Sequence, residues 1–131
     1  NKVHAAGLVI RDLPLVASNH RKTATITEFL KEQNVVAIAE IDNAPAGFVS
    51  WKPNIAPGIG ELTLNAVHPD HGGKGVGTAL YEHALAALKA AGMQLATVGT
   101  GGDPSHAPAR RAYEKAGFSV HIPSIYMYRK L

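Results

Sequence analysis

The chain has no cysteine among its 131 residues, few aromatic residues (6%) and no apolar run approaching the length of a membrane span. Without cysteine, a disulfide framework, a thiolate nucleophile and a thiolate metal site are excluded. The scarce aromatics are not interleaved with cations, so no stacking platform for nucleic acid is visible. No charged and then apolar leader opens the chain. We therefore expect a soluble, cytoplasmic protein that binds neither nucleic acid nor membranes.

The length and charge of the chain limit the number of domains and the kind of ligand that we expect. A chain of 131 residues can bury a core of its own, so we expect residues 1–131 to form a single domain. The chain does not begin with Met, which suggests a start inside a longer gene product and an incomplete N-terminal strand. Lys and Arg number 13 against 10 for Asp and Glu, a net charge of +3. This is ordinary surface charge, although a small positive excess also favours a polyanionic ligand.

The most informative segment is Gly72–Gly77, with the sequence GGKGVG, between an apolar strand and a long helix. Four glycines in six positions remove the Cβ atoms that would hold a ligand away, and they permit positive φ. Consecutive N–H groups can then turn toward one ligand. The helix that starts near Gly75 adds its positive dipole end and its unpaired first-turn donors. The segment therefore predicts a site for a phosphate or pyrophosphate.

Two familiar phosphate loops do not fit this segment. A Walker loop requires Ser or Thr after its lysine, whereas Lys74 is followed by Gly75. The dinucleotide fingerprint requires a third glycine at position 78 or 80, where Thr78 and Leu80 stand. Neither a magnesium nucleotide nor a dinucleotide is therefore indicated.

The order strand, proline, GGKGVG and helix resembles the acetyl-CoA-binding motif of the GNAT superfamily of N-acetyltransferases, Gln/Arg-x-x-Gly-x-Gly/Ala. Gly72 stands at its first position, which loses a side-chain contact to the phosphates and keeps the backbone cradle. A later segment, 106–118, resembles the family pattern Asn-x-x-Ala-x-x-x-Tyr-x-x-x-Gly-Phe, with Tyr113 at the tyrosine and His106 in place of Asn. Together the two segments extend the resemblance over roughly positions 35 to 131.

The resemblance implies an acetyl-CoA-dependent N-acetyltransferase that acts on a primary amine of a small molecule or peptide by direct attack. It implies no metal and a monomer or homodimer. The residues that it assigns to the cofactor are Ala66, Val67, Gly72, Gly73, Lys74, Gly75, Val76, Gly77, Thr78, His106 and Ala109. The alternative is a catalytically silent CoA-binding domain with a sensing or interaction role, since fold resemblance alone does not separate the two.

Two residues are candidates for proton transfer. Glu61 lies six residues before Val67, where several family members carry a carboxylate base. Tyr113 matches the family tyrosine whose hydroxyl can protonate the leaving thiolate. Both residues also have an interpretation without a catalytic role. Glu61 could be a strand residue that faces solvent, and Tyr113 could be a core aromatic whose hydroxyl is hydrogen-bonded.

The seven histidines raise the question of a metal site. His68 and His71 are close in sequence, but Pro69 prevents a helix from bringing both rings to one face. We therefore expect solvated loop histidines and no metal. The amine pocket is the least defined part, and Phe29, Trp51, Tyr126 and Tyr128 are candidates for its walls.

The hydrophobic patterns predict one α/β (α+β) domain with a mixed central sheet flanked by helices. We expect strands over 35–41, 46–51, 59–67 and 93–98, helices over 25–33, 75–91 and 105–116, and closing strands over 119–122 and 124–129. A loop is expected around Pro53 and Pro57. The resemblance implies that the parallel strands 61–67 and 93–99 splay apart to admit the pantetheine arm.

Overall fold

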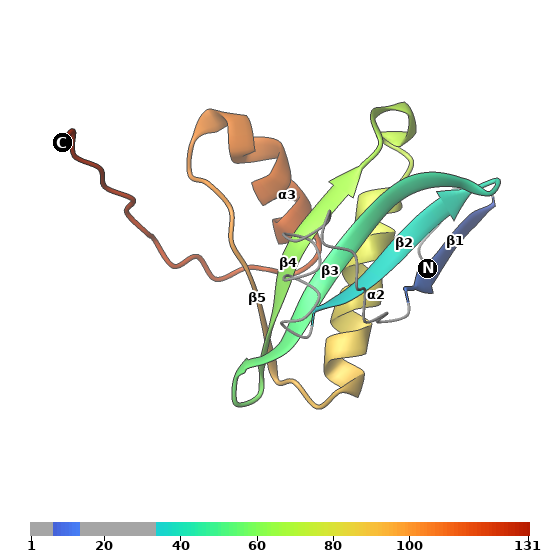
Figure 1. The fold of residues 1–131 in the computed structure, drawn as a ribbon, viewed down its shortest axis with the longest axis horizontal. Helices are drawn as coiled ribbons and strands as arrows, with labels where there is room; N and C mark the ends of the chain where they lie inside the picture. The colour runs from blue at the N-terminus through green and yellow to red at the C-terminus, as the bar shows by residue number, and fades with distance from the viewer. Residues whose placement is uncertain (1–6, 14–33) are drawn as a thin grey trace.

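The computed structural model describes residues 7–13 and 34–131 (Figure 1). It contains one sheet of five strands in the order β1-β2-β3-β4-β5. The strands are β1 (Leu8–Asp12), β2 (Val35–Ile41), β3 (Ala44–Ala56), β4 (Ile59–Val67) and β5 (Leu95–Val98), and the helices are α2 (Val76–Ala90) and α3 (Ala107–Lys115). Short 3₁₀ turns over 69–71 and 104–106 precede the two helices. The helix predicted over 25–33, with Phe29, lies outside the described residues.

The β2–β3 hairpin follows from its turn residues. Asp42 and Asn43 both have positive φ, 52° and 66°, as a two-residue turn that matches the twist of its strands requires. Asp and Asn accept this conformation more readily than other residues with a Cβ. The turn sets the pairing Ile41 to Ala44, and the strands then continue antiparallel.

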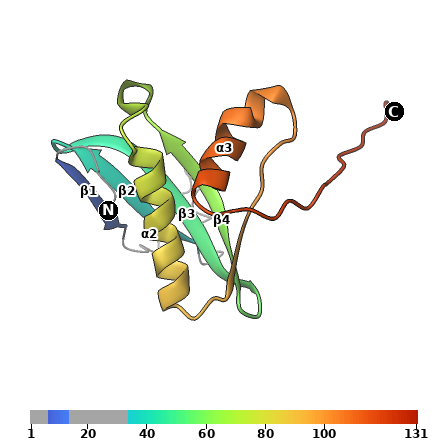
Figure 2. The same cartoon turned by 180° about the vertical axis from the view of Figure 1, so that it is seen from behind.

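One face of the sheet carries the core. Ala37, Ala39 and Ile41 alternate along β2 and are buried, while α2 covers the same face with Leu80, Leu88 and other apolar side chains. The helix shows the corresponding 3.6-residue spacing, with Val76, Leu80, Ala84 and Leu88 buried. Figure 2 shows α2 lying across β2, β3 and β4. No helix in residues 7–13 and 34–131 is long and apolar enough to cross a membrane.

The strands β4 and β5 are parallel, as expected, and pair over only four positions. Their register runs from Ile59 opposite Leu95 to Leu62 opposite Val98. Beyond Leu62, β4 continues for five residues to Val67, whereas β5 ends at Val98 and its chain turns toward α3. Figure 1 shows the two segments diverging, with α3 beside the upper half of β4. The predicted mixed sheet with splayed parallel strands is therefore confirmed.

Two local predictions were wrong. The closing strands expected over 119–122 and 124–129 are absent from the structure, and this segment extends away from the domain as coil (Figures 1 and 2). The expected loop around Pro53 is instead the far end of β3, which runs to Ala56 before turning at Gly58, φ 75°. The N-terminal strand was expected to be incomplete and was given no bounds; it is β1, over 8–12, with the β-branched residues Val9 and Ile10.

Candidate active site

The glycine segment forms the loop between β4 and α2, preceded by the 3₁₀ turn over 69–71. Gly73 and Gly75 have left-handed backbone, with φ 75° and 78°. Gly75 is the N-cap of α2 and provides no side-chain cap, so no side chain of the cap shields the first-turn N–H groups. Residues 72–75 are exposed, whereas Val76 is buried and anchors the start of the helix. The loop therefore presents backbone and a helix N-terminus to solvent, as an anion site requires.

Three glycines of this loop, Gly72, Gly73 and Gly77, are not needed to avoid protein atoms. A Cβ on Gly73 would meet nothing within 4 Å, and one on Gly72 would reach only a carbonyl oxygen at 3.5 Å. A Cβ on Gly77 would make ordinary contacts, 3.5 Å from Val67 and 4.0 Å from Tyr81. Packing within the domain thus leaves the space above the loop open. Bare backbone beside open space, with a helix N-terminus behind it, fits a pyrophosphate.

Strand β4 is irregular just before its splayed half. Between Trp51 opposite Leu62 and Val49 opposite Asn65, the single residue Ser50 faces two residues of β4. The extra residue is accommodated by hydrogen bonds: the Leu64 N–H donates to Ser50 Oγ (2.9 Å). Such a bulge changes the face to which the following side chains point.

A buried polar cluster supports this bulge. Ser50 and Asn34 are almost fully buried, and Thr63 joins them. Thr63 Oγ1 lies 2.8 Å from Ser50 Oγ and donates to Asn34 Oδ1 (3.0 Å). Buried polar groups are stable only when they are hydrogen-bonded, so this cluster holds the bulge in a defined shape. The upper half of β4 is thereby fixed independently of β5.

Asn65 is the first residue after the bulge that points toward the helices, and it connects two tyrosines. The Tyr81 hydroxyl, from α2, donates to Asn65 Oδ1 (2.9 Å). Asn65 Nδ2 donates to the Tyr113 hydroxyl oxygen, from α3 (2.9 Å). The tyrosine rings are tilted, with centroids 5.2 Å apart. The Asn65 side chain therefore connects β4, α2 and α3 where β4 and β5 separate.

The hydrogen-bond directions give the two hydroxyls different roles. Tyr113 accepts from Asn65, so its own hydrogen is not used in that bond. The Tyr81 hydroxyl hydrogen, in contrast, is used in the bond to Asn65 Oδ1. Burial, and after it the nearby Tyr113, raise the pKa of Tyr81 to about 12. Tyr81 therefore remains protonated over the working range of any ordinary enzyme and keeps Asn65 oriented toward Tyr113.

Glu61 lies apart from this cluster. It stands opposite Lys52 on β3 and Thr97 on β5, within the paired half of β4. Its neighbour Leu62 points into the core, so the Glu61 side chain points to the opposite face of the sheet. The bulge then directs Asn65 to the helix face. Glu61 and Asn65, the β4 residue that binds Tyr113 of α3, thus lie at different levels of the strand and on opposite faces of the sheet.

The start of α3 is organised by Asp103. Its carboxylate accepts from Ser105 Oγ and lies 2.6 Å from His106 Nδ1. These contacts, that of Ser105 first and that of His106 second, lower the pKa of Asp103 to about 2. Arg110 Nη1 donates to the Gly101 and Asp103 carbonyl oxygens (2.6 and 2.8 Å), which fixes the loop after β5. His106 is therefore held at an exposed turn, with one ring nitrogen engaged locally.

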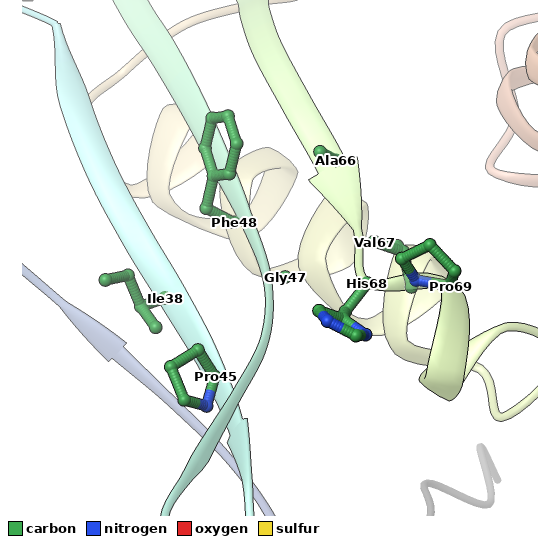
Figure 3. A pocket seen from close by; sticks show the side chains of 8 residues that line it. All are labelled: Ile38, Pro45, Gly47, Phe48, Ala66, Val67, His68 and Pro69. Carbon is green, nitrogen blue, oxygen red and sulfur yellow. The ribbon is translucent and has the colours of Figure 1, made fainter.

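An apolar cavity of about 380 Å³ lies at the end of β4, against β2 and β3 (Figure 3). Ile38, Phe48 and Ala66 form one cross-strand row on this wall, and they stand on the face away from α2. The remaining lining residues are Pro45, Gly47, Val67, His68 and Pro69. Figure 3 shows His68 and Pro69 on the side that leads to the glycine loop. His68 and Pro69 therefore lie between the cavity-lining end of β4 and the loop.

The structure brings only part of the predicted site together. Residues 66 and 67 end the strand that leads to the loop 72–78, while Tyr113 reaches the splay from α3 with Ala109 one turn earlier. Lys74 Nζ lies 3.3 Å from His71 Nδ1. No group of three or more metal-binding side chains occurs in the part of the chain that the structure describes. Trp51, considered for the acceptor pocket, is in the core, whereas Tyr126 and Tyr128 lie on the extended C-terminal segment.

Sequence reasoning missed Asn65 and Tyr81. A polar residue near the end of an otherwise apolar strand was a signal for Asn65, and Tyr81 follows Leu80 at the start of the predicted helix. Their meeting depends on the bulge, which turns Asn65 to the helix side. No spacing rule on one strand predicts that change of face.

Solved structures that share this fold include the following three. A protein described as a GNAT-family acetyltransferase from Desulfovibrio desulfuricans is 27% identical, with a TM-score of 0.71 over 88% of this chain and 87% of that chain. An IAA acetyltransferase from Bacillus cereus is 23% identical, with a TM-score of 0.72 over 88% and 79%. An aminoglycoside N-acetyltransferase in complex with CoA is 18% identical, with a TM-score of 0.70 over 94% and 100%.

Two sequence matches differ in extent. A 42-residue stretch is 62% identical to the carbamoyl phosphate synthase small chains of Photobacterium profundum and Escherichia coli. It makes up 32% of this chain and 11% of each of those proteins, so the chain spans about a tenth of the length of the curated relatives it matches. The acetyltransferase (GNAT) family, in contrast, matches over residues 9–118. Because this second match covers most of the sequence and agrees with the fold, the chain belongs to the GNAT acetyltransferase family.

Proposed function

We propose that the protein is an N-acetyltransferase that moves an acetyl group from acetyl-CoA to a primary amine. The observation that carries this proposal is the arrangement of groups where β4 and β5 separate. There an anion-binding loop at the N-terminus of α2 lies at the end of β4, the strand whose Asn65 holds the Tyr113 hydroxyl. Family membership supports acetyl transfer, and the two local features supply a place for the cofactor and for a proton donor.

The cofactor side of the proposal rests on the glycine loop. Acetyl-CoA supplies an activated thioester and a pyrophosphate group by which the protein can bind it. The N–H groups of 72–78 hold the pyrophosphate, helped by the dipole of α2 and by Lys74. The backbone of Ala66 and Val67 borders the pantetheine arm, and Ala109 and His106 lie on its α3 side. The net charge of +3 favours a polyanion from a distance.

Three proton movements complete the reaction. Glu61 takes one proton from the acceptor ammonium, directly or through water, so that a neutral amine nitrogen can form a bond to the acetyl carbonyl carbon. The carbon–sulfur bond breaks, its electron pair stays on sulfur, and Tyr113 gives its hydroxyl proton to that sulfur. The second proton lost by the amine nitrogen then returns through solvent to Tyr113. The absence of cysteine excludes an acetyl-cysteine intermediate, and the proposed transfer to the amine is direct.

Asn65 assists the acid step. Its Nδ2 donates to the Tyr113 oxygen, and this hydrogen bond becomes stronger as that oxygen gains negative charge. Tyr81 holds the amide in the correct orientation, because Asn65 Oδ1 is occupied by the Tyr81 hydroxyl. Asn65 and Tyr81 are therefore positioning residues for Tyr113.

The proposed function is tested by thiol release from acetyl-CoA over a panel of primary amines and N-terminal peptides. Amine-dependent release, with the acetyl group found on the amine by mass spectrometry, is the expected result. Binding of CoA with no turnover on any amine would instead favour a silent CoA-binding domain. Absence of CoA binding would contradict both functions.

We expect the Glu61→Gln variant to lose kcat/KM mainly at low pH. Most of the acceptor is then protonated and needs a base, whereas rising pH supplies free amine and restores part of the rate. The measurement is a pH–rate profile at subsaturating amine. Glu40→Gln is the control, since Glu40 is a carboxylate on β2 that pairs with Arg11. A Glu61→Gln profile that overlays the wild type would remove Glu61 from the mechanism.

A further inference from the structure

His71 ends the 3₁₀ turn over 69–71 and lies directly before the glycine loop. It is half-buried, and its ring packs edge-on against the ring of His68, with centroids 5.8 Å apart. His68 is the N-cap of this turn, and its Nδ1 accepts the N–H of Asp70 (3.1 Å). The His71 N–H donates to the His68 carbonyl oxygen (2.9 Å). The turn therefore fixes the position of the His71 ring beside the loop.

The partner of this ring is the Lys74 ammonium. Lys74 Nζ lies 3.3 Å from His71 Nδ1. A lysine ammonium donates hydrogen bonds and accepts none, so His71 Nδ1 is the acceptor and carries no proton in this arrangement. The structure thus places a neutral imidazole in contact with one cation.

The loop itself supplies little positive charge. Lys74 is the only charged residue among positions 72–77 of the sequence. Gly72 stands where the family motif has Gln or Arg, so it brings no side chain to the phosphates. The pyrophosphate of CoA carries a negative charge on each of its two phosphoryl groups. The Lys74 ammonium alone therefore balances only part of the charge that the loop is proposed to hold.

We propose that CoA binding is coupled to the uptake of a proton by His71, an inference that rests on the proposed function. Beside Lys74 alone, a protonated His71 would place two like charges in contact, which disfavours the charged imidazole. A pyrophosphate next to both groups reverses this balance, because each cation then has an opposite charge nearby and donates a charge-assisted hydrogen bond. His71 thereby supplies the second cation that position 72 lacks.

The surrounding charges are consistent with this coupling. Asp70 Oδ2 lies 3.7 Å from His68 Nδ1, and both of these side chains are more than half exposed. The start of β3, over 44–47, and the first turn of α2, over 76–79, carry no charged side chain. Lys74 is therefore the charged group in contact with His71, and His68 is the one other titratable ring beside it.

The coupling gives the pH effect a definite sign. The complex holds one proton more than the separate partners, so CoA affinity rises as the pH falls toward the range in which an imidazole gains its proton. We expect CoA to bind about tenfold more tightly at about pH 6 than at about pH 8. A loop that bound the pyrophosphate through backbone N–H groups and Lys74 alone would show no such dependence.

The measurement is calorimetric titration of the full chain with dephospho-CoA across this pH range. Dephospho-CoA keeps the pyrophosphate and lacks the 3′-phosphate, whose own charge changes near pH 6. Titrations in two buffers of different ionisation enthalpy count the protons taken up. We expect uptake of a fraction of one proton at about pH 7. If only CoA itself binds, the variants below are compared with CoA, because the titration of its 3′-phosphate is common to all of them.

Two variants of His71 separate its charge from its hydrogen bond. In His71→Gln the side-chain oxygen still accepts from Lys74 but takes up no proton, so affinity should stay at the wild-type value for about pH 8 at every pH. In His71→Arg the charge is permanent, so affinity should stay near the wild-type value for about pH 6. Circular dichroism checks that each variant is folded, and His71→Arg decides the question if His71→Gln does not fold.

His68→Asn is the matched control. Asn caps a turn as His68 does, and this variant leaves His71 and Lys74 in place. It should keep the wild-type pH dependence and proton uptake. Proton uptake that persists in His71→Gln, or that is lost in His68→Asn alone, would overturn the proposal.

The failure of this inference is distinct from the failure of the proposed function. Wild-type affinity that does not change with pH would overturn the coupling and leave CoA binding intact. Binding of neither CoA nor dephospho-CoA at any pH would count against the proposed function, and the coupling would fall with it.

Discussion

The Gly73→Val variant is expected to lose CoA affinity by about a hundredfold or more, measured by calorimetric titration. Gly73 has φ 75°, and a β-branched side chain in that conformation costs about 1–3 kcal/mol. The new side chain also enters the open space above the loop, where a Cβ meets no protein atom within 4 Å. That space is where the pyrophosphate is proposed to lie, so the side chain excludes the ligand itself.

Gly92→Val is the matched control for this effect. Gly92 also has positive φ, 91°, and open space at its Cβ, but it lies past the other end of α2. The two substitutions should lower the free energy of unfolding by similar amounts. Only Gly73→Val should weaken CoA binding. Equal CoA affinities for the two folded variants would place the pyrophosphate elsewhere.

The second large effect is expected for Tyr113→Phe, with kcat falling about a hundredfold at saturating substrates. The ring and its contacts with Tyr81 and Phe118 remain, so CoA affinity should be almost unchanged. The loss appears in kcat because the hydroxyl proton is used only as the thiolate leaves. Rapid-quench measurement of the acetyl-transfer step checks that chemistry, and not product release, is being compared.

Tyr81→Phe is the control from the same cluster. It removes the hydrogen bond to Asn65 Oδ1 and leaves the Tyr113 hydroxyl in place. We expect a smaller decrease in kcat, since Tyr81 acts only through the orientation of Asn65. If Tyr113→Phe decreases kcat no more than Tyr81→Phe does, Tyr113 is a core residue without a role in proton transfer.

Local signals in the sequence predicted much of the fold. Strands 35–41 and 59–67 were predicted with the bounds that the structure gives, because apolar alternation and turn residues mark both ends. The family resemblance, based on GGKGVG and on the later segment with Tyr113, is confirmed by the match over 9–118. Both segments are local in sequence, so no tertiary information was needed to find them.

The C-terminal segment could not be predicted in the same way. Residues 119–122 and 124–129 have strand composition, but a strand also needs a neighbour with which to pair. Composition does not reveal whether that neighbour lies in the same chain. The structure leaves these residues unpaired.

The candidate site depends on similar non-local information. The roles of Glu61 and Tyr113 remain predictions carried over by resemblance, and the role of the loop remains a prediction from its glycines and the helix start. Asn65 was missed because its direction depends on the bulge at Thr63 and Leu64, which depends in turn on the buried hydroxyl of Ser50. A contact made by three distant segments leaves no regular spacing in any one of them.

The measurement that tests the central claim most directly is an amide NMR titration of the full chain with CoA. The account predicts that the backbone N–H resonances of 72–78 shift most, because these groups donate to the pyrophosphate. Amides of β1, over 8–12 at the opposite edge, should be unchanged. Saturable binding with the largest shifts outside the loop, and none within 72–78, would contradict the account.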